Sequence, residues 1–266
     1  MELNTILIVV DPTADRQPAF ERGLDTAWDT GARLHLYACA SESSGFSDLE
    51  EARAKIQPRL DELAGRASRD GYEVSSELEW ATDWAPQIVS AANRIDASMI
   101  LKHSLDHRSV DREKRTTSDW VLLRSAPCPV LLVKDFHDWS HRRILAAVNP
   151  AATEGAHVRL NEQITSLAQR LSTLHGSDAH FVTAFQNMNK VPDAGKYAGE
   201  WGIGTEHVHM RKGSPADVIR DVASELEVDL VIVGTVARDG IKGRVVGNTC
   251  ERLLDQTHSD LLVLNQ

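Results

Sequence analysis

The feature that most constrains the fold is an internal repeat, because the second half of the chain reproduces the pattern of the first. Each half opens with a short apolar run that leads into a polar residue and a proline, at Ile6 to Pro12 and at Ile144 to Pro150. Each half closes with a helix-like segment and an apolar strand, at Val130 to Val133 and at Leu261 to Leu264. Such self-similarity indicates a duplicated structural unit.

The length and composition of the chain agree with this division. Its 266 residues are long for one small domain and suit two domains of roughly 130 residues each. With 42% hydrophobic and 26% charged residues, each half can bury a core of its own. We therefore predict one domain over residues 1–137 and a second over residues 138–266.

Between these landmarks, apolar strands alternate with segments of helical periodicity. In the first half, Phe20, Leu24 and Trp28 recur at helical spacing, Gly31 is a suitable helix stop, and a strand follows. Continuous apolar strands separated by helices are typical of parallel sheets that are covered on both faces. The pattern predicts an α/β fold with two tandem Rossmann-like domains, each an open five-stranded parallel sheet flanked by helices.

The last strand of each half would leave an exposed sheet edge. Because unpaired edges promote aggregation, we expect the two last strands to pair and the halves to form an intramolecular pseudo-dimer. The sequence leaves any higher oligomeric state open.

The middle of the second half is shorter than that of the first. Leu36 to Lys102 spans 66 positions, whereas the matching stretch from Val182 to Gly234 spans 52. We predict a truncated second helix there and a mobile glycine- and proline-rich loop over residues 186–204. A surface connector is the favoured interpretation of this loop, and a functional lid is the alternative.

Charge and cysteine content exclude several classes of protein. The net charge of −10 (29 basic against 39 acidic residues) disfavours a nonspecific DNA clamp, so we expect no direct nucleic-acid binding. No signal peptide and no apolar run of membrane-spanning length is present, which predicts a cytoplasmic protein without membrane association. The three cysteines, at 39, 128 and 250, are widely spaced, and we expect them to be reduced and structural.

Two loops of each half are candidates for a ligand site, because ligands of open parallel sheets bind at the carboxyl ends of strands. In the second half, one of them is the glycine-rich stretch from Gly234 to Thr249, whose cations are Arg238, Lys242 and Arg244. Glycines let backbone amides approach phosphate oxygens, which favours an anion site. The alternative is purely structural, because Asn248 and Glu251 have the spacing of a helix capping box.

The doubled β-α repeat and this loop resemble the universal stress protein family. Nucleotide-binding members carry Gly-x-x-Gly, nine residues, then Gly-Ser or Gly-Thr, and here the same register gives Gly234, Ala237, Gly247 and Asn248. Because two of these four positions depart from the pattern, we expect at most weak ATP binding, confined to the second half. The cofactor-binding residues that the resemblance implies are Asn149, Gly234, Thr235, Ala237, Gly247, Asn248 and Thr249. The matching loop of the first half, residues 102–118, contains no glycine, so we expect no ATP there.

Further stretches narrow the resemblance to the tandem universal stress protein E group. They include Val10-Asp11-Pro12, Leu101-Lys102-His103 and Ser118-Asp119-Trp120. The group implies a cytoplasmic, non-catalytic stress-response protein linked to survival of DNA damage, starvation or oxidative stress. The alternative is a stress-response protein that has lost ATP binding and uses its cleft for an apolar or metal ligand, or its surface as a scaffold for partners.

The remaining candidate residues favour structural roles. The histidine pairs His207 and His209, His103 and His107, and His137 and His141 could ligate zinc, but we expect surface or capping roles and predict no metal site. No catalytic triad or carboxylate pair stands out, so we predict no enzyme. Five tryptophans crowd the first 139 residues, and we expect packing roles for them ahead of an apolar ligand pocket. They are Trp28, Trp80, Trp84, Trp120 and Trp139.

Overall fold

The structure is a computed structural model of the chain. It describes residues 2–104, 118–134, 139, 142–187, 191–236, 238–240, 243–245 and 248–265. The chain divides into two compact units: unit 1 contains the described residues up to Lys134, and unit 2 contains those from Trp139 onward. The predicted boundary at residues 137 and 138 lies outside the described residues.

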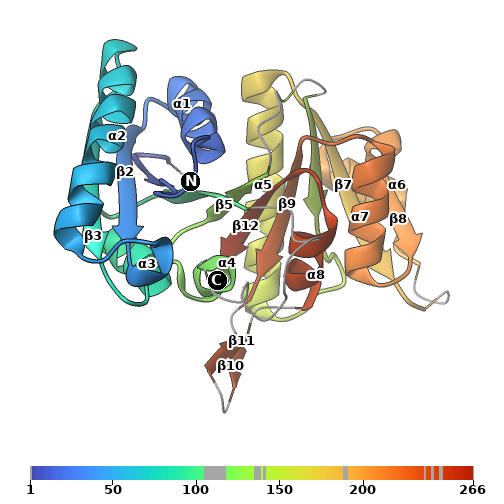
Figure 1. Ribbon diagram of the computed structural model, residues 1–266. Helices are drawn as coiled ribbons and strands as arrows, with labels where there is room; N and C mark the ends of the chain where they lie inside the picture. The colour runs from blue at the N-terminus through green and yellow to red at the C-terminus, as the bar shows by residue number, and fades with distance from the viewer. Residues whose placement is uncertain are drawn as a thin grey trace. The chain divides into compact units, whose positions relative to one another are not determined.

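Unit 1 is a parallel sheet with helices between its strands (Figure 1). The strands lie in the order β3-β2-β1-β4-β5, and every neighbouring pair is parallel. In chain order, the elements are β1 (Thr5–Val9), α1 (Pro18–Thr30), β2 (Arg33–Ala40), the 3-10 turn η1 (Glu42–Ser44), α2 (Leu49–Arg69), β3 (Val74–Trp80), α3 (Ala85–Arg94), β4 (Met99–His103), α4 (Ser118–Ser125) and β5 (Val130–Val133).

Unit 2 repeats this arrangement, with the order β8-β7-β6-β9-β12 and parallel pairing throughout. A two-stranded antiparallel ribbon, β10 with β11, follows β9. The elements are β6 (Arg143–Ala147), α5 (Gly155–His175), β7 (Asp178–Phe185), α6 (Ala194–Trp201), η3 (Thr205–His207), β8 (Val208–Lys212), α7 (Pro215–Glu225), β9 (Leu230–Thr235), β10 (Arg238–Gly240), β11 (Gly243–Val245), α8 (Asn248–Gln256) and β12 (Asp260–Asn265).

The predicted alternation of strand and helix is therefore confirmed in both units, with five parallel strands in each main sheet. The apolar runs that predicted the first strands form the centre of each core. All five residues of β1 are buried, and so are Ile144 and Leu145 of β6. A strand that is apolar on both faces is stable only where helices cover both faces. In unit 1, α1 packs on β1 and β4, while α3 packs on β2 and on α4.

The first helix of each unit ends in the same way. Gly31 after α1 and Gly176 after α5 adopt left-handed backbone conformations, with φ of 71° and 60°. Only glycine enters this region without steric cost, and it lets the chain turn sharply into the next strand. The helix stop predicted at Gly31 is confirmed, and unit 2 uses the same device.

Helix α6 corrects the prediction of a loop over residues 186–204. Its first turn is capped by the side chain of Asp193, which accepts a hydrogen bond from the Lys196 amide. Trp201 stacks on Phe181 of β7 and on Tyr197, with ring centroids 4.9 and 5.3 Å apart. These aromatic contacts stabilise the helix, although the glycines of the segment have low helix propensity. The predicted truncation is present, because α6 has 8 residues and α2 of unit 1 has 21.

Helix α2 continues through Pro58, because an apolar stripe holds the helix against the sheet on both sides of the proline; the stripe consists of Ala52, Ile56, Leu60, Leu63 and Ala67. One further local prediction is wrong. Trp28 does not pack in a core, since 76% of its surface is exposed. Its place at helical spacing after Phe20 and Leu24 puts it beyond the edge of the buried stripe.

None of the helices in the described part of the chain is both long and apolar enough to cross a membrane. The three cysteines are buried and free of disulfides, as the sequence predicts.

Candidate functional site

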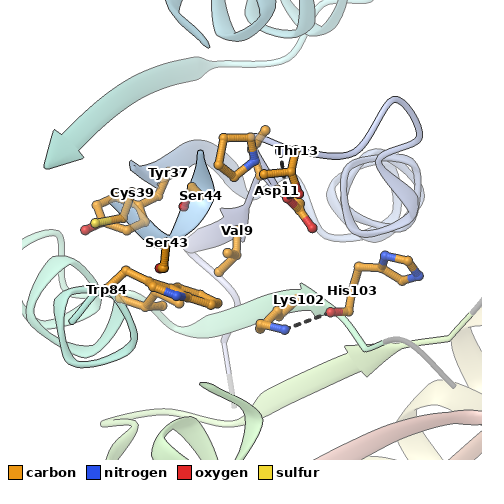
Figure 2. A pocket seen from close by; sticks show the side chains of 13 residues that line it. Val9, Asp11, Thr13, Tyr37, Cys39, Ser43, Ser44, Trp84, Lys102 and His103 are labelled. Atoms are coloured by element: carbon orange, nitrogen blue, oxygen red, sulfur yellow. Dashed lines mark hydrogen bonds between the residues drawn. The ribbon is translucent and has the colours of Figure 1, made fainter. Parts of the chain in front are cut away.

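The strand order of unit 1 reverses between β1 and β4, and the carboxyl ends of these two strands border a cavity of about 230 Å³. In open α/β sheets, the place where the order reverses is where ligands bind. Figure 2 shows the cavity, with side chains from β1, β2, β4, η1 and the start of α3 around it. Its lining residues are Val9, Val10, Asp11, Pro12, Thr13, Tyr37, Cys39, Ser43, Ser44, Trp84, Ile88, Lys102 and His103.

One wall of the cavity is aromatic. Trp84 precedes α3 as its N-cap residue, and its half-buried ring lines the cavity (Figure 2). Ile88, one helical turn further on, is fully buried beneath it. An exposed aromatic face beside buried aliphatic side chains binds planar or apolar molecules, because their contact removes apolar surface from water.

The cation at the floor of the cavity is already paired. Lys102 of β4 places its Nζ 2.7 Å from Oδ1 of Asp119, and both side chains are largely buried. Asp119 lies in the first turn of α4, where the helix dipole stabilises a carboxylate, and its Oδ2 accepts a hydrogen bond from Ser104. Since its charge is balanced locally, Lys102 adds little net positive potential to the cavity.

Asp11, directly after β1, is the acidic group of the cavity. Its Oδ1 accepts hydrogen bonds from the amide and the hydroxyl of Thr13, at 2.8 and 2.7 Å. The side-chain amide of Gln17 bonds to both the N–H and the C=O of Asp11, which fixes the loop. Each carboxylate oxygen has more than one lone pair, so Asp11 can accept a further donor from a ligand.

Tyr37 and Cys39 of β2 line the cavity as neutral groups. Burial, followed by a hydrogen bond to Glu79, raises the pKa of Tyr37 far above its ordinary value. Burial also raises the pKa of the Cys39 thiol. A protonated thiol is a poor nucleophile, so Cys39 contributes to packing rather than to covalent chemistry.

In unit 2, the structure brings part of the predicted site together. Asn149 follows β6, Gly234 and Thr235 end β9, and these two strands are neighbours in the sheet. Asn248 and Thr249 begin α8. The other two predicted residues, Ala237 and Gly247, lie outside the described residues.

Gly234 has a structural role that the sequence does not reveal. A Cβ atom at this position would lie 2.3 Å from Cδ2 of Leu160, a buried residue of α5. The glycine thus permits close packing of α5 on β9. Its neighbour Thr235 is buried, and its hydroxyl has no hydrogen-bond partner among the described residues.

The predicted glycine-rich loop after β9 is partly ordered as an antiparallel ribbon, which the sequence did not predict. Arg238 pairs with Val245 and Asp239 with Arg244 across β10 and β11. In Figure 1 this ribbon projects away from the sheet of unit 2.

A wider cavity of unit 2, of about 430 Å³, lies elsewhere. It is bordered by α5, α6 and the loop after β6, through residues that include Pro150, Asn161, Tyr197 and Trp201. None of the seven predicted site residues lines it. Asn161 holds the loop after β6 by bonding to the backbone of Asn149, as Gln17 does in unit 1.

The sequence model of the universal stress protein family matches residues 2–134 and, a second time, residues 139–265. The chain belongs to the universal stress protein family. The two matches fall on the two units, so this is a tandem member, as its repeat and motifs predicted.

Curated relatives share almost the whole length of the chain. The "Universal stress protein E homolog" of Haemophilus influenzae is 28% identical, over 98% of this chain and 97% of that protein. "Universal stress protein E" of Escherichia coli K12 is also 28% identical, over 97% of this chain and 93% of that protein. The resemblance to the E group is therefore confirmed.

Solved structures agree with the fold. A "Putative Universal Stress Protein" from Pseudomonas aeruginosa UCBPP-PA14 superposes with a TM-score of 0.82 at 28% identity, covering 99% of this chain and 93% of that one. A universal stress protein from Archaeoglobus fulgidus DSM 4304 superposes with a TM-score of 0.76 at 17% identity, covering 100% and 99%, and supports the fold alone.

The cavity residues of this universal stress protein were not predicted as a site, because they lack the glycine pattern of a phosphate loop. Lys102 occurs in the sequence only as part of a family motif, and a packing role is the expectation for Trp84. The sequence does offer one signal, namely the closely spaced Trp80 and Trp84 together with Asp11 after the first apolar run.

The histidines also lie differently from the prediction. His103 lines the cavity of unit 1, whereas His107, His137 and His141 lie outside the described residues. His207 and His209 are not isolated surface groups, because both rings contact His180 of the neighbouring strand.

Proposed function

We propose that this universal stress protein is a non-enzymatic, cytoplasmic stress-response protein that binds a small, neutral and largely apolar molecule in the cavity of unit 1. The observation that carries the proposal is the position of this cavity at the carboxyl ends of β1 and β4, with the ring of Trp84 as its wall. Most small-molecule sites are concave, mainly apolar and equipped with few polar groups.

The charge balance supports a neutral ligand. An anion would need an unpaired cation, and Lys102 is paired with Asp119. Because the pair is largely buried, drawing Lys102 away from Asp119 to bind a phosphate would be unfavourable. A neutral molecule keeps the pair intact.

Asp11 supports a ligand that carries a donor. Its carboxylate lies at the rim of the cavity and accepts hydrogen bonds only from its own loop among the described residues. A hydroxyl or amino group on the ligand would add a charge-assisted bond and fix its orientation.

The absence of catalysis is supported by the chemistry of the cavity. Cys39 and Tyr37 are held protonated by burial. A catalytic site needs groups whose pKa values are tuned toward the working pH.

A second candidate function is weak adenine-nucleotide binding in unit 2, with ATP as the cofactor. It is favoured by the adjacency of Asn149 and Gly234, which places two of the residues implied by the family motif at the carboxyl ends of neighbouring strands. The buried Thr235 hydroxyl beside them could accept a ligand's hydrogen bond. The departures at Ala237 and Asn248 limit the expected affinity.

The neutral apolar dye N-phenyl-1-naphthylamine, which carries one N–H donor, tests the first proposal. Its fluorescence should rise on titration into the full chain, with one site per chain. Ser43→Trp fills the mouth of the cavity from an exposed lining position and should weaken binding by at least tenfold.

Glu42→Trp is the matched control, because Glu42 is exposed in the same 3-10 turn and does not line the cavity. This variant should bind the dye as the parent does. Equal binding by the parent and by Ser43→Trp would place the dye elsewhere and contradict the proposal.

A further inference from the structure

Three histidines and an aspartate meet at the amino-terminal end of β7 and β8 in unit 2, away from the carboxyl ends discussed above. His180 lies near the start of β7, His207 ends η3, and His209 lies in β8. The ring of His180 lies between the other two, with centroid distances of 4.8 Å to His207 and 5.2 Å to His209. Asp178 begins β7 beside them.

We propose that Asp178, His180 and His207 bind a divalent transition-metal ion of the zinc class. Each residue offers one ligand atom, and the three atoms lie within 4.8 Å of one another. Two imidazoles and a carboxylate form a ligand set that Zn²⁺ accepts, with a fourth position left for water or a further ligand.

The distances between the candidate ligand atoms allow one ion to contact all three residues. Nε2 of His207 lies 2.8 Å from Oδ1 of Asp178, and Nε2 of His180 lies 3.5 Å from Oδ2 of the same carboxylate. Ligand atoms that bind zinc tetrahedrally at about 2.0–2.1 Å are separated by about 3.3 Å. Small side-chain rotations would therefore place an ion among the three.

A metal would bind both histidines through Nε2 and leave a hydrogen on each Nδ1. Nδ1 of His180 lies 3.1 Å from Nε2 of His209, which can accept that hydrogen, whereas Nδ1 of His207 lies 3.5 Å from Oε1 of Glu206 and makes no hydrogen bond among the described residues. Without a metal, Nε2 of His207 is hydrogen-bonded to Asp178, so metal binding would replace this bond. Ligating histidines typically donate their other N–H to a hydrogen-bond partner, which orients the ring.

Unit 1 holds a natural comparison at the same place in the repeat. His35 pairs with Leu7 in the sheet, as His180 pairs with Leu145. The neighbours of His35 are different, because its ring bonds to the hydroxyl of Ser75 at 2.8 Å and to Glu77 at 3.2 Å. One histidine with a hydroxyl and a carboxylate satisfies its hydrogen bonds internally, whereas unit 2 places two imidazoles beside one carboxylate and a third imidazole against the first.

The test uses the full chain, stripped with a chelator and titrated with Co²⁺ as a spectroscopic probe and with Zn²⁺ in a calorimeter. We expect one site per chain, with visible Co²⁺ absorption bands typical of tetrahedral coordination. His207→Gln and Asp178→Asn each remove a ligand from a partly exposed position and should weaken binding at least tenfold. Excess Zn²⁺ should raise the Tm of the parent and not that of His207→Gln.

His35→Gln is the matched control and should bind both metals as the parent does. Circular dichroism of each metal-free variant checks that the fold is retained. The proposal is overturned if the parent binds neither metal, if His207→Gln and Asp178→Asn bind with parental affinity, or if His35→Gln abolishes binding.

Discussion

Gly234 of β9 and Leu160 of α5 are packed so closely that a Cβ atom on the glycine would lie 2.3 Å from the leucine Cδ2. The family resemblance assigns this glycine to a nucleotide loop, and the contact gives it a role in packing as well. A glycine in a motif position is therefore weaker evidence for a phosphate site here than the sequence suggests.

Gly234→Ala should destabilise the protein by roughly 1–3 kcal/mol, because an added methyl group overpacks the contact with Leu160. Urea unfolding measures the change. Gly199→Ala is the control, since nothing lies within 4 Å of a Cβ there, and in α6 this change should be neutral or stabilising by up to about 1 kcal/mol. When Leu160 is also replaced by alanine, Gly234→Ala should no longer lower the free energy of unfolding. If it still lowers this free energy by the same amount, the contact with Leu160 is not the cause.

Asp119→Asn should change the charge preference of the unit 1 cavity. The substitution keeps an oxygen for the Ser104 hydroxyl and removes the charge that neutralises Lys102. Binding of the anionic dye 1-anilinonaphthalene-8-sulfonate should strengthen about tenfold, while binding of neutral N-phenyl-1-naphthylamine changes less than twofold. A parallel change for both dyes would mean that the charge of Lys102 does not control ligand choice.

Two of the three cysteines should react slowly in the native protein. Burial raises the pKa of the Cys128 thiol to about 12 and also raises that of Cys39, so little thiolate is present at pH 8. Alkylation with iodoacetamide, followed by peptide mass spectrometry, should modify both cysteines in urea and leave them largely unmodified in buffer. Native-state alkylation of Cys39 at the rate of a free thiol would contradict this account and reopen a covalent role.

ATP binding, where present, should depend on the loop of unit 2. Gly247→Val should abolish it by blocking the approach of the backbone to phosphate. Ala237→Gly with Asn248→Ser restores the family pattern and should strengthen binding without changing the fold, as circular dichroism and calorimetric titration of the full chain would report. No gain in affinity would mean that this loop is not a nucleotide site.

The fold could be predicted from the sequence because its signals are local and occur twice. The runs at Ile6 to Val9 and Ile144 to Ala147 are apolar throughout, and such runs form central parallel strands in whichever unit they occur. Helix α6 was missed because Gly195 and Gly199 lower its propensity. The stacking of Trp201 on Phe181 outweighs this effect, and that contact depends on tertiary structure.

The sites could be predicted less well, because their residues meet only through strand register. His180 and His209 are 29 residues apart and come into contact because Val182 pairs with His209 across β7 and β8. Trp84 and Lys102 become neighbours because α3 returns the chain to β4 beside β1. Neither contact can be predicted from residue spacing along the sequence. The glycine motif can be recognised in the sequence, and it indicates a site in unit 2 instead.

The identity of the molecule held by the native protein tests the central claim most directly. The full chain and its Ser43→Trp and Glu42→Trp variants are purified from their host cells under nondenaturing conditions, weighed by native mass spectrometry, denatured, and analysed for released small molecules. We expect a neutral, largely apolar molecule with a hydroxyl or amino group, bound at up to one per chain in the parent and in Glu42→Trp and depleted in Ser43→Trp. Release of an adenine nucleotide alone, or of the same molecule in equal amounts from all three proteins, would contradict it.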